Sequence, residues 1–159
     1  MNFVDAMQDH TFLSFWSTPV TNIPLQEPKH WVDYYVKKLG DETPHLGGYF
    51  PCRYPHETYA AMISHWDEQI GKLVAKLKEK GEYENTLIIF TSDNGPTFNG
   101  GTDSPFFDSA KPFKSEYGWG KTSLREGGIR VPMIACWTGK VKGGRTSNHV
   151  SAFWDVMPT

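Results

Sequence analysis

A long helical pattern followed directly by a short apolar run constrains this chain most. Across residues 57–80, apolar side chains recur at spacings of three and four, which places them on one face of a helix. These side chains are Tyr59, Met62, Ile63, Trp66, Ile70, Leu73, Val74 and Leu77. Gly81 is a typical helix stop, and residues 86–91 are continuously apolar, as in a strand covered on both faces. The two patterns predict a helix leading into a buried strand.

Weaker patterns predict the other elements. The aromatic-rich run at residues 11–16 suits a buried strand, and residues 31–39 suit a short helix. Residues 92–130 have no periodicity and many glycines, which indicates a long loop, and such loops are usually functional or disordered. Residues 131–137 predict a last strand, and residues 151–159 the start of a helix. The order of strand, helix, strand, loop and strand predicts the α/β class.

Composition excludes several classes of protein. The 159 residues suit one domain or a large piece of one. The net charge of −2 and pI near 6.3 give no basic surface for nucleic acid. No apolar run approaches the roughly 18 residues of a membrane span, and the polar first ten residues do not resemble a signal peptide. Two cysteines, Cys52 and Cys136, are too few for a disulfide framework. We therefore expect neither a nucleic-acid nor a membrane partner.

The first candidate site is the sequence Ser92-Asp93-Asn94-Gly95, directly after the apolar strand. Ligands of α/β sheets collect where strands end, and Asp and Asn side chains offer hard oxygen ligands for Ca²⁺ or Mg²⁺. Alternatively, Asn94-Gly95 is a plain hairpin turn. Against a hairpin, Pro96 follows at once and no pairing strand appears for over thirty residues. Both interpretations stay open at this point.

The second candidate is Lys121 in the glycine-rich stretch 118–130. A lysine beside glycines can bring a positive charge to an anion that the backbone also approaches, although such a lysine is more often simply solvated. A phosphate-binding loop is excluded because no strand precedes Gly120-Lys121-Thr122 and position 115 is Ser rather than Gly. No two of the six histidines have the spacing of a metal-binding helix.

Taken together, residues 59–159 resemble the second half of the catalytic domain of the sulfatase (arylsulfatase) family. Residues 11–28 match more loosely. The matching segments, in order, are Tyr59-Ala60-Ala61-Met62-Ile63, Asp67, Ile70-Gly71, Asn85-Thr86, Ser92-Asp93-Asn94-Gly95, Gly120-Lys121, Glu126-Gly127-Gly128-Ile129-Arg130-Val131-Pro132, Trp137-Thr138-Gly139 and Asp155-Val156-Met157-Pro158-Thr159.

The resemblance implies a partial alkaline-phosphatase-like fold, with a mixed or parallel sheet flanked by helices. It implies hydrolysis of sulfate esters on a sulfated small molecule or glycan, with a formylglycine nucleophile and Ca²⁺, or alternatively Mg²⁺. Asp93 and Asn94 match two of the family's metal ligands, and Lys121 matches the lysine that contacts the sulfate. A metal and a fixed ammonium would both stabilise the charge that develops in sulfate transfer.

The departures from the family pattern lead to further expectations. The formylglycine motif Cys-x-Pro-Ser-Arg, the paired N-terminal aspartates and the Gly-Lys-x-x-x-Gly segment are absent, and Asn22 stands where a histidine is expected. We expect residues 1–159 to be a single partial catalytic domain, truncated at both ends and inactive alone. We also expect self-association through exposed sheet surface. Many family members are periplasmic or secreted, but the sequence predicts no location.

Two alternatives stay open. A phosphoesterase or phosphonate monoester hydrolase of the same superfamily would share the sheet and loops, although zinc-dependent members tend to carry His in place of Asn94. A catalytically inactive homologue acting as a binding or structural module would explain Asn22 and the missing segments.

Overall fold

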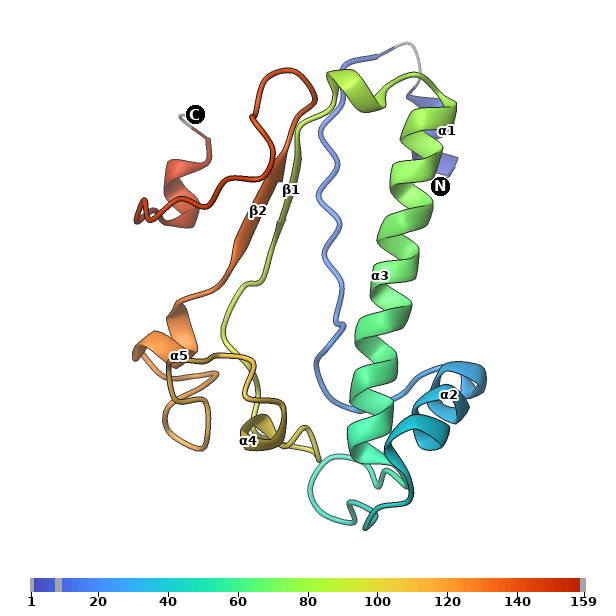
Figure 1. The fold of residues 1–159 in the computed structure, drawn as a ribbon, viewed down its shortest axis with the longest axis vertical. Helices are drawn as coiled ribbons and strands as arrows, with labels where there is room; N and C mark the ends of the chain where they lie inside the picture. Colours follow the sequence, from blue (N-terminus) through green and yellow to red (C-terminus); the bar gives the residue numbers. More distant parts are fainter. Residues whose placement is uncertain (1, 8–9, 158–159) are drawn as a thin grey trace.

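The computed structural model describes residues 2–7 and 10–157. It confirms a mixed α/β fold, in which helices and loops accompany a small sheet (Figure 1). The elements in chain order are α1 (Asn2–Ala6), α2 (Lys29–Leu39), α3 (Pro55–Glu79), the 3₁₀ helix η1 (Tyr83–Asn85), β1 (Ile88–Thr91), α4 (Ser104–Phe107), α5 (Glu126–Ile129), β2 (Met133–Cys136) and the 3₁₀ helix η2 (Phe153–Asp155).

The long helix α3 confirms the strongest sequence prediction. It begins with Pro55, whose fixed φ and missing N–H suit a first helical position, and Gly81 follows its end with φ +75°. Tyr59, Met62 and Leu77 of the predicted apolar face are buried, whereas Ile63 is 46% exposed. The predicted helix at 31–39 is also confirmed as α2, which packs against α3.

The sheet consists of β1 and β2, paired antiparallel with Ile88 opposite Cys136 and Thr91 opposite Met133. Both strands were predicted. The expectation that residues 86–91 are covered on both faces is wrong for the described chain, because Ile89 and Phe90 are each 40% exposed. The reason is that β1 and β2 make their extensive contacts with each other rather than with α3.

The predicted buried strand at residues 11–16 is also wrong. This segment is extended, as Figure 1 shows beside α3, but it belongs to no strand, and Leu13 and Phe15 are 86% and 89% exposed. Trp16 packs on Trp66 of α3, with ring centroids 4.5 Å apart. A strand needs a partner for its backbone groups, and none of the described segments provides one here.

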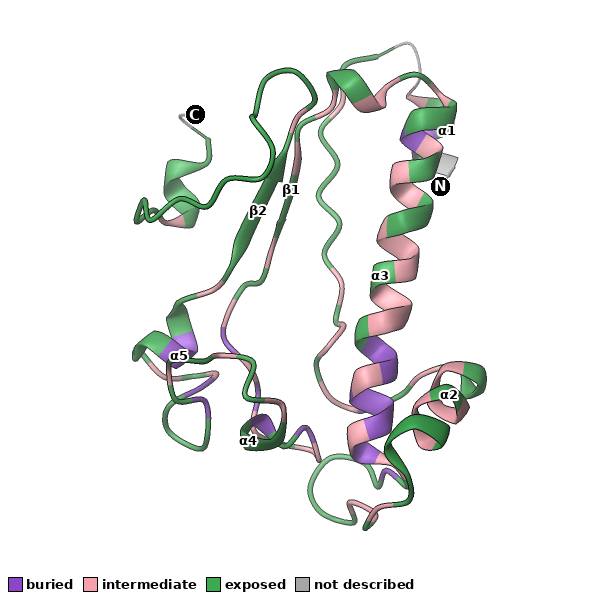
Figure 2. Cartoon of the chain, viewed as in Figure 1, coloured by how far each residue is buried: buried purple, intermediate pink, exposed green. Residues whose placement is uncertain are grey.

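The main apolar cluster lies at the N-terminal end of α3 (Figure 2). Leu25, Cys52, Tyr59 and Met62 are buried there, and Val20, Ile23 and Phe107 pack against them. The cluster therefore joins three loops to one end of α3: the loop before α2, the loop before α3 and the loop around α4.

The predicted C-terminal helix appears only as the short η2, and residues 158–159 of that prediction lie outside the described residues. None of the helices described is both long enough and apolar enough to cross a membrane.

Candidate functional site

The long loop between β1 and β2 folds back on itself so that the two candidate clusters meet at the carboxyl end of β1. The Gly95 N–H donates to the Gly128 carbonyl at 2.8 Å, and the Lys121 N–H donates to the Pro96 carbonyl at 2.9 Å. A Cβ at Gly120 would lie 2.6 Å from that same Pro96 oxygen, so only glycine allows this approach. Because β1 pairs with β2, and even the nearest paired residues, Thr91 and Met133, are 42 positions apart, Asn94-Gly95 is not a two-residue hairpin turn.

Asp93 and Asn94 lie in the bend that follows β1. Asp93 is exposed, and the Asn94 carboxamide donates to the Gly95 carbonyl at 2.9 Å. Their oxygens suit Ca²⁺ chemically, but Ca²⁺ takes about six to eight oxygen ligands. Within residues 2–7 and 10–157, no three His, Cys, Asp or Glu side chains gather in a way that could hold a metal ion. The two residues therefore fit part of a calcium site, and this part of the chain does not complete it.

Lys121 lines a hollow of about 220 Å³ together with Asn22. Asn22 accepts the Ile23 N–H through Oδ1 at 2.8 Å, which fixes its carboxamide. The Lys121 ammonium forms no ion pair or hydrogen bond with any described side chain, so its positive charge is not compensated within the described part of the chain. The structure thus places the residue found at the expected histidine position beside the predicted anion-binding lysine.

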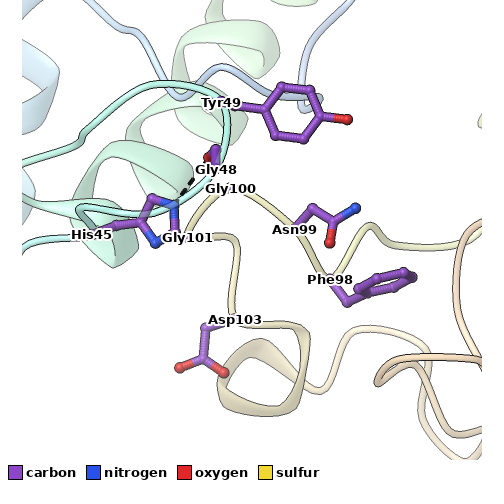
Figure 3. Close-up of a pocket in the computed structure, with 8 residues that line it drawn as sticks. All are labelled: His45, Gly48, Tyr49, Phe98, Asn99, Gly100, Gly101 and Asp103. Atoms are coloured by element: carbon purple, nitrogen blue, oxygen red, sulfur yellow. Dashed lines mark hydrogen bonds between the residues drawn. The ribbon is translucent and has the colours of Figure 1, made fainter.

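A larger hollow of about 490 Å³ adjoins the first (Figure 3). Tyr49, Phe98 and Asn99 line both hollows, so the two share these residues as a common wall. Sequence reasoning missed this second hollow, because its residues lie in loops and follow no period. The remaining lining residues are His45, Gly48, Gly100, Gly101 and Asp103.

A polar cluster holds one wall of the larger hollow. His56, at the start of α3, has Nδ1 2.8 Å from Glu42 Oε2 and Nε2 2.8 Å from Asp103 Oδ2. Both ring nitrogens donate to these carboxylates when the imidazole is protonated. The His56 ring also stacks on Phe106, with centroids 4.0 Å apart. The cluster thus ties Asp103 to α3.

Glu57, next along α3, is the buried acid beside this cluster. It is only 2% exposed, and its Oε2 has no hydrogen-bond partner among the described residues. Burial, followed by the hydrogen bond and negative charge of Glu42, raises the pKa of Glu57 to about 7. Neither Glu57 nor His56 was predicted as a site residue.

Comparison with known proteins identifies the family pattern across the whole chain. The family model described as Sulfatase matches residues 1–159. The human N-acetylgalactosamine-6-sulfatase is 28% identical over 155 residues, which covers 94% of this chain and 24% of that protein. The Escherichia coli protein named uncharacterized sulfatase YdeN is 33% identical over 103 residues, covering 65% of this chain and 17% of the other.

Solved structures agree. The crystal structure of Ps i-CgsB superposes with a TM-score of 0.68 and 32% identity, covering 90% of this chain and 27% of that one. Its complex with k-i-k-neocarrahexaose superposes with a TM-score of 0.65 and 32% identity, covering 86% and 26%. The chain thus spans about a quarter of the length of these relatives.

Proposed function

Because this chain belongs to the sulfatase family, we propose that it supplies the sulfate-binding part of a site that hydrolyses sulfate esters. The observation that carries the proposal is Lys121, which lines a hollow beyond the carboxyl end of β1 and whose ammonium has no partner among the described side chains. A sulfate group of the substrate would accept hydrogen bonds from this ammonium. A fixed positive charge stabilises the negative charge that grows on the sulfate oxygens and the leaving oxygen as the ester bond breaks.

Asp93 and Asn94 would hold Ca²⁺, or alternatively Mg²⁺, at the end of β1, together with ligands that the described residues do not supply. When bound, the metal would add positive charge against the sulfate oxygens. In this proposal Asp93 contributes a carboxylate and Asn94 its carboxamide oxygen, since the carboxamide nitrogen already donates to Gly95.

The nucleophile in this proposal is a formylglycine from outside this chain. Cys52 is buried, with Sγ 3.4 Å from Thr58 Oγ1, and Cys136 lies within β2. Neither is followed by the Pro-Ser-Arg pattern. Asn22 cannot act as a general acid at neutral pH, so another group must protonate the leaving oxygen.

The proposed substrates are sulfated sugars. Relatives of this chain carry the names N-acetylgalactosamine-6-sulfatase and N-acetylglucosamine-6-O-sulfatase. The hollow beside Lys121 offers hydroxyl and carboxamide groups from Thr97, Asn99 and Thr122, which suit a polar ligand better than an apolar one.

The test is a titration of the complete 159-residue chain with phenyl sulfate, in which binding is monitored by two-dimensional ¹H–¹⁵N NMR. We expect saturable shifts at residues 22, 97–99 and 121–122. Lys121→Ala should weaken binding about tenfold or more, since hydrogen bonds to charged groups contribute roughly 1.5–3 kcal/mol. Lys140→Ala is the matched control, because Lys140 is an exposed lysine outside both hollows. Equal weakening by both variants would refute the site.

A second measurement concerns turnover. The chain alone should not hydrolyse an aryl sulfate with or without Ca²⁺, because the proposed nucleophile lies outside it. Hydrolysis above the level of the Lys121→Ala variant would contradict this part of the proposal.

A further inference from the structure

We propose that the His56 cluster, formed by His56, Glu42 and Asp103, is a pH-operated switch that holds the α4 turn against the start of α3 at acid pH and releases it as the pH rises. The cluster joins three segments: the loop before α3 through Glu42, the first turn of α3 through His56, and the loop before α4 through Asp103. The switch goes beyond the proposed function, since none of these residues lines the hollow of Lys121.

The His56 cluster requires a protonated imidazole. Nδ1 lies 2.8 Å from Glu42 Oε2, and Nε2 lies 2.8 Å from Asp103 Oδ2. An ionised carboxylate only accepts hydrogen bonds, so each contact needs an N–H on the ring. A neutral imidazole carries one N–H, and its other nitrogen would then direct a lone pair at a carboxylate. Loss of a single proton, of the kind that histidines undergo at near-neutral pH, therefore breaks one of the two contacts.

The contact with Asp103 is the one that breaks. Glu42 is the more buried partner, with 14% of its side chain exposed against 44% for Asp103. Glu42 also accepts the backbone N–H of His56 at 2.8 Å, so it holds the histidine at two points. Loss of the ring N–H would leave a largely buried charge on Glu42 without a partner, whereas water can reach Asp103. The remaining proton therefore stays on Nδ1, and Asp103 is released.

The buried Glu57 broadens the pH range of the switch. Burial and the neighbouring Glu42 raise the pKa of Glu57 to about 7. As Glu57 ionises, it faces Glu42 as a second carboxylate and pushes Glu42 away from the start of α3. The same negative charge attracts the His56 proton and delays its loss. The first effect opens the cluster and the second extends the opening over a wider range of pH.

Three other charged or titratable groups lie around the cluster. Arg53 pairs with Asp41 and donates to the Glu42 carbonyl at 2.8 Å, so its charge is already balanced. His45 lines the larger hollow together with Asp103. A protonated His45 would attract Asp103, and this attraction also falls as the pH rises. These groups therefore leave the sign of the pH dependence unchanged.

Release of Asp103 would loosen the α4 turn. Asp103 caps this turn by accepting the Phe106 N–H at 3.2 Å, and the Phe106 ring stacks on His56. The backbone of Asp103 has φ +42°, a conformation that persists only where contacts enforce it. Phe107 still packs on Tyr59, with ring centroids 4.7 Å apart, so the opening is local. Since Asp103 lines the larger hollow (Figure 3), the protonation of His56 would alter one wall of that hollow.

The experiment measures amide hydrogen exchange in the complete chain by NMR at about pH 5.5 and about pH 8, as protection factors corrected for the intrinsic pH dependence of exchange. The reporters are the Phe106 and Phe107 N–H groups, which donate to the Asp103 carbonyl. The main variant is Asp103→Asn, whose carboxamide can accept the Phe106 N–H through oxygen and donate to a neutral imidazole through nitrogen. Asn tolerates a positive φ, so this variant should fold normally. Asp108→Asn is the matched control, because Asp108 is an exposed aspartate with φ +45° that pairs with Lys111 rather than with a histidine.

In the unaltered chain, protection of these amides should fall about 3- to 10-fold between the lower and the higher pH, the value of one lost hydrogen bond. In Asp103→Asn the order should reverse, because the carboxamide nitrogen fits a neutral imidazole but would face an N–H of the protonated one. Asp108→Asn should behave like the unaltered chain. His56→Gln, which carries no charge at either pH, should lose most of the pH dependence. Equal protection at both pH values in the unaltered chain, or an undiminished fall in both Asp103→Asn and His56→Gln, would overturn the proposal.

Discussion

Replacement of Glu57 by Gln should make this protein more stable at alkaline pH and leave it almost unchanged at acid pH. Glu57 is 2% exposed, has one carboxylate oxygen without a described partner, and lies beside Glu42. Gln has nearly the same shape as a protonated Glu but carries no charge at any pH. The other titratable groups around it, Glu42, His56 and Asp103, are the same in both proteins, so the difference isolates Glu57.

The sign follows from the raised pKa. Burial holds the pKa of Glu57 at about 7 in the folded protein, against an ordinary value of 4.5, so the folded state binds this proton more tightly than the unfolded state. The resulting stability is complete below pH 4.5 and is lost as pH rises through 7. At 1.36 kcal/mol for each pH unit of difference, the loss amounts to roughly 3 kcal/mol at most.

The assay is urea denaturation followed by circular dichroism at about pH 5 and about pH 8. At each pH, the free energy of unfolding of the unaltered protein is subtracted from that of Glu57→Gln. This difference should be roughly 2–3 kcal/mol larger at pH 8 than at pH 5. Glu84→Gln, at an exposed glutamate, should change the free energy by less than about 0.5 kcal/mol at both. A Glu57→Gln difference that stays constant with pH would refute the reasoning.

Three further variants test other parts of the structure. In a urea titration, Gly120→Ala should lower the free energy of unfolding by at least about 2 kcal/mol, because the added Cβ would lie 2.5 and 2.6 Å from two carbonyl oxygens. Gly143→Ala is the control and should have little effect, because a Cβ there would have no atom within 4 Å. The double variant Leu13→Lys, Phe15→Lys should reduce self-association, measured as molar mass by light scattering, without lowering the melting temperature. The reason is that both side chains are over 85% exposed. An unchanged molar mass would show that this surface does not drive association. Thr102→Val should cost about 1–3 kcal/mol and speed amide exchange in the 97–102 turn, whereas unchanged exchange would mean that the hydroxyl does not hold that turn.

The sequence allowed the two longer helices, α2 and α3, to be predicted because their evidence is local. The apolar spacing in α3 repeats from Tyr59 to Leu77, which is about five turns at 3.6 residues per turn, and Pro55 and Gly81 mark the ends of the helix. The runs that became β1 and β2 were also recognisable. Residues 11–16 have the same apolar character but form no strand, because strand formation depends on a distant partner that a local pattern does not contain.

The site was predictable only in part, for a related reason. Lys121 and the bend at Asp93 stood out by composition and by resemblance to a family, and their placement near one end of β1 follows the general rule for α/β sheets. The His56 cluster could not be predicted, since its hydrogen bonds join residues 14 and 47 positions apart. No single-sequence pattern links polar residues at such separations.

The long loop between the strands shows why hydropathy says so little about this site. Every residue buried between positions 92 and 130 is a glycine, a serine or a threonine, and the aromatic side chains of this stretch remain at least partly exposed. The buried residues are Gly95, Thr97, Thr102, Ser104, Ser115, Gly120, Gly127 and Gly128. A loop without regular structure must still satisfy its buried backbone groups, and hydroxyl side chains do so here, as when Ser104 Oγ donates to the Ser115 carbonyl at 2.8 Å. Glycines let the neighbouring segments approach closely enough for the remaining backbone pairs. The position of Lys121 therefore depends on polar and glycine contacts rather than on an apolar core, so substitutions that leave the hydropathy of this loop unchanged can still displace the site.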